Sequence, residues 1–509
     1  MRFPTISAIA IASVFLFDTV LSATPAEWRG RSIYQVFTDR FAPTDSTTKP
    51  SCPSGYGGYC GGTWQGIISK LDYIQGMGFT AIWISPVVEQ VADPSRGYHG
   101  YSAQDLYSVN TNFGSADDLK ALAAALKSRG MYPGLLESCA DISTYLMVDV
   151  VANHMASDDA AESIDYTIIN PFNDKKYFHD ICWVTDYNNQ TNVELCWLGN
   201  DQYPLPDLNT TRTDVRSMFS SWVEYLVSTY SIDGLRVDTV KHVEGPFWSI
   251  FNSASGVYNV GEVADGNVPY VCPYQNYMDG VLAYPTYYQA TEFFSDTSAT
   301  SLNFVNEVKA MNSQCKDTTL LGSFSENHDQ PRFAYYTSDL VLARNILVFT
   351  MLQDGIPIVY QGQEQHFSGA GDPYDREALW TSNYDTSAPL YELTKQMNAI
   401  RSLAIAKSSD YLTWHTQIVY SDAHNVAFRK GTSSYMILMV VNNLGEQAEN
   451  YSVTMPSVGF PAGLTVVDVL SCNNVTVDAN GGLAAAFVGG LPMVYYPYFL
   501  LPGTGWCGY

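Results

Sequence analysis

Short hydrophobic runs alternate along the chain with longer segments whose apolar residues recur at helical spacing. Several runs are apolar throughout instead of alternating with polar residues, which is the pattern of parallel strands covered by helices. The predicted strands are Ile33–Phe37, Ala81–Ile84, Leu146–Val150, Gly234–Val237, Tyr258–Val260, Gly280–Leu282, Leu320–Phe324 and Pro357–Tyr360. Helical spacing is clearest in Ala116–Lys127, Val215–Thr229 and Leu340–Leu352. This order predicts an α/β fold, a (β/α)8 TIM barrel, with a doubly wound parallel sheet as the structural alternative.

Two segments interrupt this alternation and predict further domains. Residues 154–208 are rich in Tyr, Asn and Asp but show little helical pattern, so we expect an irregular domain inserted after strand 3. Short alternating runs typical of an antiparallel β-sandwich begin near residue 413; they include Tyr435–Val441, Thr465–Leu470 and Leu491–Tyr496. The prediction is a barrel over residues 24–153 and 209–412, the insertion over 154–208, and a C-terminal antiparallel β-sandwich over 413–509.

Residues 1–23 have the layout of a cleavable signal peptide. Arg2 precedes the apolar stretch Ile6–Phe17, and the small residues Ser22 and Ala23 follow it. That stretch is too short to span a bilayer. Sequons for glycosylation agree with passage through a secretory pathway; they start at Asn189, Asn209, Asn450 and Asn474. We therefore expect a secreted, extracellular protein.

The charge balance excludes two classes of partner. The 509 residues include 26 Lys and Arg against 51 Asp and Glu, a net charge of -25. Such a charge repels phosphate backbones and anionic lipid heads, so we expect binding neither to nucleic acid nor to a membrane. Charged residues are only 15% of the chain and aromatic residues are 14%. This composition argues against disorder and suits neutral, hydroxyl-rich ligands.

The nine cysteines are expected to be bridged in an oxidising compartment. Proximity in the sequence gives four pairs and leaves Cys139 over, and an odd cysteine in a secreted chain needs an explanation. The pairs are Cys52 with Cys60, Cys182 with Cys196, Cys272 with Cys315, and Cys472 with Cys507.

Polar clusters follow four of the predicted strands, at the ends where a (β/α)8 barrel carries its catalytic groups. They are Asp149-Val-Val-Ala-Asn-His154, Gly234-Leu-Arg-Val-Asp-Thr-Val-Lys-His242, Gly261-Glu-Val263 and Phe324-Ser-Glu-Asn-His-Asp329. A single acid at a strand end can be a helix cap or a solvated loop residue. Three carboxylates with His and Arg at successive strand ends indicate an active site instead.

These four segments resemble the conserved regions of glycoside hydrolase family 13, and Leu205-Pro-Asp-Leu208 resembles that family's additional short motif. Similarity to secreted fungal alpha-amylases runs from about Arg31 to the final cysteine and includes the group's disulfide pairs. Further matching motifs are Tyr98-His-Gly-Tyr101, Cys196-Trp-Leu-Gly199, Ser231-Ile-Asp-Gly234, Cys272-Pro-Tyr-Gln-Asn276 and Tyr360-Gln-Gly-Gln-Glu364.

The resemblance implies catalytic roles for three acids: Asp238 as nucleophile, Glu262 as acid/base and Asp329 as the acid that stabilises an oxocarbenium-like transition state. Hydrolysis with retention does need one carboxylate nucleophile and one carboxylic acid. Arg236 and Asp238 are two apart on a strand, so their side chains point the same way, and the guanidinium should favour ionised Asp238. Glu262 must stay protonated at the working pH. The alternative for the trio is a buried salt-bridge network.

The resemblance also implies substrate-binding residues, namely Tyr101, His154, Arg236, Lys241, His242, His328, Asp372 and Arg376. His154 and His328 would hydrogen-bond the hydroxyls of the sugar being cleaved, and Tyr101 would stack on its apolar face. Lys241 and His242 would face the leaving-group side. For these two, and for Asp372 and Arg376, a plain loop role is the alternative.

Four residues match the family's calcium site: Asn153, Glu194, Asp207 and His242. Their oxygen ligands suit hard Ca2+, whereas a soft metal would need thiolates. His242 is expected to contribute its backbone carbonyl. The ion would be structural and would tie the insertion to the barrel, and the alternative for Asn153 and Asp207 is turn chemistry.

Two features depart from the resemblance. Ser102 stands where the fungal enzymes usually carry Trp, which would remove a stacking platform and alter product length. Residues 133–145, which contain Cys139, interrupt what would otherwise join Tyr132 to Leu146. A helix-to-strand connection lies on the barrel face away from catalysis, so this segment is either a tolerated surface loop or an artefact of the gene model.

The resemblance implies a secreted, monomeric, endo-acting alpha-amylase that hydrolyses internal α-1,4-glucosidic bonds of starch and malto-oligosaccharides with retention. A related α-glucan transferase or an exo-acting, maltogenic hydrolase would use the same three acids, and acceptor positions such as Ala264 would decide between them. The rival from another class is a non-catalytic glycan-binding protein on the same barrel, against which the presence of all three acids counts.

Overall fold

The computed structural model describes residues 23–45, 47–129 and 143–509. Most of the predicted signal peptide lies outside the described residues, as does most of the 133–145 interruption with Cys139. Among the described residues no helix is long and apolar enough to cross a membrane.

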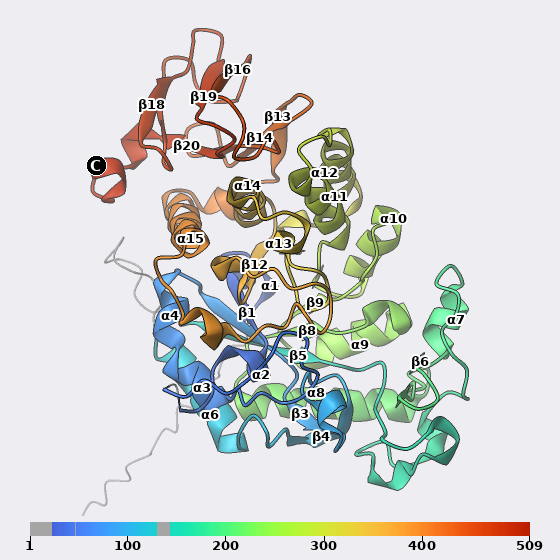
Figure 1. Ribbon diagram of the computed structural model, residues 1–509. Coiled ribbons are helices and arrows are strands. Elements are labelled where there is room, and N and C mark those ends of the chain that lie inside the picture. The colour runs from blue at the N-terminus through green and yellow to red at the C-terminus, as the bar shows by residue number, and fades with distance from the viewer. Residues whose placement is uncertain (1–22, 46, 130–142) are drawn as a thin grey trace, which may run out of the picture.

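Eight parallel strands form a barrel at the centre of the molecule (Figure 1). They are β1 (Ile33–Val36), β2 (Ala81–Ile84), β5 (Tyr145–Val150), β8 (Gly234–Val237), β9 (Tyr258–Gly261), β10 (Gly280–Val281), β11 (Gly322–Ser323) and β12 (Ile356–Tyr360). Their order in the sheet is β10-β9-β8-β5-β2-β1-β12-β11, and a parallel bridge between Leu282 and Gly322 joins its two edges. The predicted barrel is confirmed, and the doubly wound alternative is wrong.

One strand is shorter than predicted. Leu320 belongs to a 3-10 turn, Thr318–Leu320, in which the Asp317 side chain accepts from the Thr319 backbone N–H, so β11 begins only at Gly322. A Cβ atom on Gly322 would lie 2.7 Å from a methyl carbon of Leu282. The neighbouring strands therefore close around a residue without a side chain.

Alternate residues of each strand face opposite sides of the barrel wall. Ile33, Ala81 and Met147 belong to a cluster inside the barrel, whereas Ile82 and Val148 pack outward with the helices. Because both sides are dry, these strands read as continuous hydrophobic runs.

Helices surround the barrel, and the longest follow each strand back to the start of the next (Figure 1). They are α3 (Trp64–Ser69), α4 (Leu71–Gly76), α6 (Ala116–Lys127), α8 (Thr213–Tyr230), α9 (Gly245–Ser255), α11 (Tyr284–Ser295), α12 (Leu302–Gln314), α14 (Leu340–Leu352) and α15 (Pro389–Lys407). Short helices are α1 (Pro25–Trp28), α2 (Thr38–Phe41), α5 (Pro94–Gly97), α10 (Val268–Val271) and α13 (Phe333–Tyr336). In α8 the apolar spacing works as predicted, because Val215, Phe219, Trp222 and Leu226 are all buried.

The segment after β5 has little regular structure. It contains α7 (Gln190–Leu195), the two-residue strands β6 (Leu198–Gly199) and β7 (Pro204–Leu205), and isolated 3-10 turns. The disulfide Cys182–Cys196 holds its outer part. It lies beside the hairpin of β3 (Val88–Gln90) and β4 (Ala103–Val109), to which it is joined by a bond from the Leu106 N–H to the Asn170 carbonyl.

Antiparallel strands form two sheets at the C-terminal end. One contains β13 (Gln417–Ser421), β14 (Asn425–Lys430), β15 (Ile437–Asn442), β20 (Met493–Pro497), β17 (Thr465–Asp468) and β18 (Asn473–Thr476); the other contains β16 (Tyr451–Met455) and β19 (Leu483–Phe487). Buried residues of both sheets, such as Val440 and Phe487, share one core. The opposite face of the larger sheet packs on the barrel's helices, because Phe428 and Met439 belong to the main core.

Polar contacts also tie these sheets to the barrel. Asp354, between α14 and β12, lies 2.6 Å from Lys430 Nζ, and both side chains are buried. Asn345 of α14 donates to the Gly490 carbonyl and accepts from the Asn442 N–H. The four expected disulfides are all formed: Cys52–Cys60, Cys182–Cys196, Cys272–Cys315 and Cys472–Cys507.

Candidate active site

The three acids singled out in the sequence lie at the carboxyl ends of barrel strands. Asp238 directly follows β8, Glu262 directly follows β9, and Asp329 stands in the loop after β11. Asp238 and Glu262 are buried, whereas the Asp329 side chain is 33% exposed. The arrangement therefore has two deep acids and one nearer solvent.

Arg236 joins the deep acids to a fourth carboxylate. Its Nη1 lies 2.7 Å from Asp238 Oδ1 and 2.9 Å from Asp149 Oδ1, and its Nη2 lies 3.1 Å from Glu262 Oε1. The ring of Trp83 lies beneath the guanidinium, 5.4 Å from it. One buried cation thus contacts three carboxylates, and strand register places one of them, because Asp149 on β5 pairs with Arg236 on β8.

Burial raises the pKa of Asp238 well above its ordinary value, the Arg236 guanidinium opposes that shift, and the carboxylates of Glu262, Asp149 and Asp329 add to it. The predicted Arg236 contact is present, but its effect on the Asp238 pKa is outweighed. Burial likewise raises the pKa of Asp149, to about 6, against the same guanidinium. Since one cation faces three carboxylates, the group is arranged to retain a proton.

Glu262 is held by donors on either side. The Thr239 N–H donates to Oε2 at 3.1 Å, and the Tyr284 hydroxyl donates to Oε1 at 3.1 Å. Thr239 adopts φ 48 and ψ 37, a left-handed conformation that a β-branched residue seldom takes. Such strain is characteristic of functional positions, and here it accompanies an N–H bond to the acid.

Tyr101 and His328 form one wall of the site. Their rings are stacked at 5.4 Å with an interplanar angle of 10°, and Gln35 Nε2 lies 2.8 Å from His328 Nδ1. Burial lowers the pKa of His328 well below its usual range, so its ring is neutral.

His154 lies next to this wall. Its Nε2 is 3.2 Å from the Tyr101 carbonyl, and burial lowers its pKa to about 4. Both predicted histidines therefore reach the site as neutral rings, able to exchange hydrogen bonds with hydroxyl groups without adding charge.

Asp329, Asp372 and Arg376 lie together at the mouth of the site. Arg376 Nη1 is 2.8 Å from Asp372 Oδ1, Nη2 is 3.4 Å from Asp329 Oδ1, and Nε donates to the His328 carbonyl at 2.9 Å. The Asp372 side chain is 51% exposed. These two acids are partly solvated, and Arg376 contacts both of them.

Lys241 and His242 lie in the 3-10 turn Val240–His242 after Asp238. Lys241 Nζ donates to the Ala264 carbonyl at 2.8 Å and lies 5.0 Å above the exposed ring of Tyr187. His242 Nδ1 is 3.1 Å from the Val193 carbonyl, and burial lowers its pKa to about 4. The His242 ring thus contacts the inserted segment.

Three of the four residues expected to bind calcium converge. The side-chain oxygen of Asn153 lies 3.0 Å from Asp207 Oδ1 and 3.0 Å from the His242 carbonyl oxygen. Oxygen atoms so close repel unless a cation joins them or the amide is turned to donate two hydrogen bonds. The Glu194 carboxylate instead accepts from Gln190 Nε2 at 2.8 Å.

An all-oxygen set of this kind fits a hard cation. In the described part of the chain no three His, Cys, Asp or Glu side chains gather as a metal cluster, but this set is an amide, one carboxylate and a carbonyl. Asp207 also bonds His179 Nδ1 at 2.5 Å. The residues present therefore fit Ca2+.

Several contact residues were not identified from the sequence. They are Gln35, Trp83 and Tyr284, which touch His328, Arg236 or Glu262. Asp149 begins one of the polar clusters named above, but its contact with Arg236 was not predicted. Gln35 and Trp83 pair across β1 and β2 and point inward one residue before the strands end. A polar or aromatic residue at an inward position next to a strand end was the available signal. Ser102, which replaces an expected Trp, is buried, and its N–H donates to Gln90.

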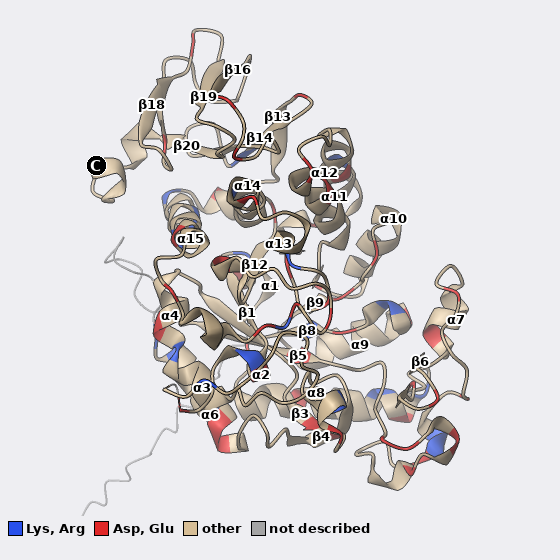
Figure 2. Cartoon of the chain, viewed as in Figure 1, with Lys and Arg blue, Asp and Glu red and all other residues tan. Residues whose placement is uncertain are grey.

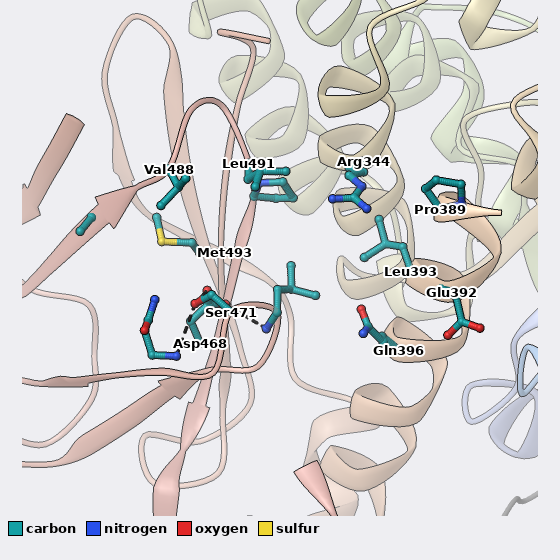
Figure 3. Close-up of a pocket in the computed structure, with 14 residues that line it drawn as sticks. Arg344, Pro389, Glu392, Leu393, Gln396, Asp468, Ser471, Val488, Leu491 and Met493 are labelled. Atoms are coloured by element: carbon teal, nitrogen blue, oxygen red, sulfur yellow. Dashed lines mark hydrogen bonds between the residues drawn. The ribbon is translucent and has the colours of Figure 1, made fainter. Parts of the chain in front are cut away.

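A separate cavity of about 270 Å³ lies between the barrel and the C-terminal sheets (Figure 3). Leu393 and Gln396 of α15 face Leu491 and Met493 across it, and Arg344 also lines it. It contains none of the predicted catalytic or substrate residues.

Comparisons with known proteins match the whole chain. The family described as alpha amylase, catalytic domain, matches residues 35–443, and alpha-amylase, domain C, matches residues 418–509. Alpha-amylase 2 of Schwanniomyces occidentalis is 48% identical over 526 residues, with 100% of both chains covered. Alpha-amylase 1 of Lipomyces kononenkoae is 49% identical over 96% of this chain and 77% of that protein. A solved alpha-amylase from Malbranchea cinnamomea superposes with a TM-score of 0.90 at 48% identity, covering 95% of this chain and 100% of that one.

Proposed function

The chain belongs to the alpha-amylase family, and from that membership we propose that it is an endo-acting alpha-amylase with Asp238 as nucleophile and Glu262 as acid/base. It hydrolyses internal α-1,4-glucosidic bonds of starch and malto-oligosaccharides with retention. The observation that carries the residue assignment is Arg236, whose two terminal nitrogens hold the Asp238 and Glu262 carboxylates at 2.7 and 3.1 Å.

Retention proceeds in two displacements. Asp238 Oδ attacks the anomeric carbon while the Glu262 carboxylic acid gives its proton to the leaving glycosidic oxygen, which forms a glycosyl ester and releases the new chain end. Glu262, now a carboxylate, takes a proton from water as that water attacks the ester. Two carboxylates held by one guanidinium suit this mechanism, because a retaining pair needs no room for water between its members.

The charge balance of the site favours retention of a proton, which the proposed roles place on Glu262. With Asp149, Asp238 and Glu262 all ionised, Arg236 would leave two buried negative charges uncompensated. Retaining one proton reduces that imbalance to one negative charge, and the proposed mechanism requires the proton on Glu262 when the substrate is bound. Tyr284 and Thr239 then orient its carboxyl group.

The mouth residues position the sugar. The Asp329 carboxylate stabilises the positive charge that grows on the sugar ring in the transition state. Arg376 holds Asp329 and Asp372 in place. The Tyr101 ring offers an apolar face, and His154 and His328 would bind hydroxyl groups as neutral rings by exchanging the hydrogen bonds that they make to the Tyr101 carbonyl and hydroxyl. Lys241 lies on the leaving-group side beside Ala264 and Tyr187.

Calcium is proposed as a structural ion held by Asn153, Asp207 and the His242 carbonyl, while the Glu194 carboxylate stays bonded to Gln190. When bound it supplies positive charge that joins the inserted segment to the turn after Asp238. His242 is four residues after Asp238, so an ion bound to the His242 carbonyl would help to fix the position of the nucleophile. We also propose that the enzyme acts outside the cell as a monomer; the four disulfides support an oxidising compartment.

Digestion of soluble starch tests this function. A fast loss of iodine staining with few reducing ends is expected of an endo-acting hydrolase, whereas release of maltose or glucose alone, or of rearranged glucans, would favour the exo-acting or transferase alternatives. Asp238→Asn and Glu262→Gln should each lower kcat by about 10³-fold or more, while the exposed-site control Asp201→Asn should not. Near-normal turnover by Asp238→Asn would overturn the assignment.

A further inference from the structure

The cavity between α15 and the C-terminal sheets is large enough for a small ligand. Its volume of about 270 Å³ lies close to the lower end of the range found for ligand pockets, which begins at about 300 Å³. Leu393 and Met493 line it and are each 5% exposed, whereas Val488, which also lines it, is 63% exposed. The cavity therefore combines a buried apolar wall with an opening to solvent.

Arg344 of α14 brings a positive charge without a partner to this cavity (Figure 3). Its Nε atom is buried and makes no hydrogen bond, and within the described residues no carboxylate forms an ion pair with its guanidinium. Burial lowers the pKa of Arg344, and no neighbouring acid opposes that shift, although a guanidinium stays charged. This half-buried cation has lost part of its hydration without gaining an anion in exchange.

The protein has many acids, but none neutralises this charge. The chain has a net charge of -25, and Figure 2 shows acidic residues spread over the helices and loops of the barrel. Two acids line the cavity, and both have other partners. Asp468 accepts from the Ser471 hydroxyl at 2.5 Å, and the half-exposed Glu392 lies 3.9 Å from Lys395 Nζ. Arg344 therefore remains available to an anion from solution.

The other lining residues indicate which anion fits. The Gln396 side chain also lines the cavity, and in the part of the chain that the structure describes it makes no hydrogen bond, so its amide can donate beside Arg344. A carboxylate can accept two parallel N–H bonds from a guanidinium. Leu491 and Met493 on the opposite wall suit an alkyl chain. The lining contains no aromatic ring on which a sugar could stack, and an inorganic anion would make no use of the apolar walls.

We propose that this cavity binds a linear aliphatic carboxylate of medium chain length. The carboxylate pairs with Arg344 and accepts from the Gln396 amide, and the alkyl chain packs between Leu393 and Met493. Such a ligand contacts α14, α15 and the C-terminal sheets at once. Because it binds only the folded protein, it stabilises the junction of the barrel with these sheets. The site lies outside the proposed active site, and it does not depend on the proposed hydrolysis.

Titration calorimetry of the full-length protein with sodium octanoate tests the site. We expect saturable binding and a rise in melting temperature when octanoate is present. Arg344→Met keeps a long side chain but removes the charge, and it should weaken octanoate binding about tenfold or more. The control is Arg212→Met, at an exposed arginine that pairs with Asp214; it should bind octanoate like the wild type. Absence of saturable binding, or equal binding by Arg344→Met, would overturn the proposal.

Two companion probes separate the contribution of the charge from that of the alkyl chain. 1-Octanol has the chain without the carboxylate, and acetate has the carboxylate without the chain. Each should bind at least about tenfold more weakly than octanoate. If either bound as tightly as octanoate, the assignment of an aliphatic carboxylate would be wrong.

Two further measurements locate the bound probe. A photoreactive diazirine analogue of octanoate should label peptides that contain Leu393 or Met493, and labelling confined to other peptides would contradict the site. Octanoate should leave the rate of maltoheptaose hydrolysis unchanged, because the cavity contains none of the proposed catalytic or substrate residues. Competitive inhibition would show that octanoate binds in the catalytic cleft instead. The variant Gln396→Ala, with its melting temperature measured, guards against misfolding of Arg344→Met and should also weaken octanoate binding.

Discussion

The Nε2 atom of His328 lies 2.6 Å from the phenolic oxygen of Tyr101. The other ring nitrogen of His328 faces the Gln35 amide, and the Tyr101 hydroxyl in turn donates to Asp149 Oδ2 at 2.8 Å. Because Gln35 donates to Nδ1, Nε2 carries the proton and donates to Tyr101. A directed chain of hydrogen bonds therefore runs from Gln35 to the carboxylate that anchors Arg236.

Removing the Tyr101 hydroxyl should break this chain at its centre. In Tyr101→Phe the ring can still stack on a sugar, but His328 Nε2–H loses its acceptor and Asp149 loses a donor. We expect kcat/KM on maltoheptaose to fall about 10- to 100-fold, the effect of one hydrogen bond to a charged group. The control Tyr277→Phe, at an exposed position, should be neutral. A Tyr101→Phe enzyme with wild-type kcat/KM would show that stacking alone matters.

The buried pair of Asp354 and Lys430 should make stability depend on pH. Burial acts to raise the pKa of Asp354. The charge of Lys430 and hydrogen bonds from His415 and Thr318 outweigh burial, and they hold this pKa well below its ordinary value. A carboxyl group whose pKa is lower in the folded than in the unfolded protein stabilises the fold at any pH above its unfolded pKa of about 4. This stabilisation is lost as the pH falls below that value. Burial lowers the pKa of Lys430, but its ammonium keeps its charge beside Asp354 at 2.6 Å.

The matching variant is Lys430→Met. It leaves a buried carboxylate without its cation and should cost about 3 kcal/mol or more at pH 7, measured by urea unfolding. At pH 3 the difference from wild type should shrink, because the Asp354 carboxylate that it leaves unpaired can take a proton. The exposed pair Lys176–Asp174 provides the control: Lys176→Met should change stability by less than about 1 kcal/mol. An equal loss at both pH values would contradict the ion-pair explanation.

Calcium should stabilise the folded enzyme through Asn153 and Asp207. At a hundredfold excess over its dissociation constant, an ion that binds only the folded state adds about 2.7 kcal/mol. Chelation should therefore lower the wild-type melting temperature, and added Ca2+ should restore it. In Asn153→Ala the chelator should have little effect. A wild-type midpoint that is insensitive to both chelator and Ca2+ would contradict the site.

Deletion of residues 133–145 should leave the barrel intact. Thr144 Oγ1 donates to the Arg129 carbonyl at 3.0 Å and the Thr144 N–H bonds to the Leu126 carbonyl, so the chain leaves and re-enters the barrel at one place. The deletion would put Tyr132 in place of Tyr145, whose ring packs on Trp28 and Arg31. Starch hydrolysis should be unchanged, because the junction lies at the end of the barrel opposite the acids.

Expression of the deletion variant with its activity and melting temperature checks this expectation, and Cys139→Ser is the companion variant. An insoluble or inactive deletion product would show that these residues contribute to the fold. Peptide mapping of the natural protein is a separate test, because a peptide spanning Cys139 would exclude a gene-model artefact.

Much of the fold follows from local pattern. Residues such as Ile82 and Val148 lie in strands that are dry on both faces, so continuous hydrophobicity is enough to identify these strands as parallel. The end of a strand is harder to predict: β11 begins only at Gly322 because a 3-10 turn occupies Thr318–Leu320, and the need for Gly at position 322 comes from Leu282 on the neighbouring segment.

Some residues of the site could likewise be predicted from local sequence pattern, and others could not. Asp238, Glu262 and Asp329 could be identified because each follows a strand within a recognisable motif. For Gln35 the only signal was a polar residue at an inward strand position, and Tyr284 offered none, since their contacts arise only when strands far apart in the sequence close into a ring. Charge states are still less predictable: Arg236 does contact Asp238 as expected, but burial and three neighbouring acids decide the Asp238 pKa, and none of these is visible in a two-residue spacing.

The contacts between the barrel and the C-terminal sheets have a consequence for how the protein unfolds. Asn345 is anchored to Gly490 and Asn442, and Asp354 to Lys430, while Phe428 and Met439 complete the core beneath the barrel's helices. Separating the parts would expose an entire sheet face and orphan a buried charge. We therefore expect the barrel and the C-terminal sheets to form a single foldon: they should melt in one transition, and neither half should survive as a soluble fragment when the chain is cut between them.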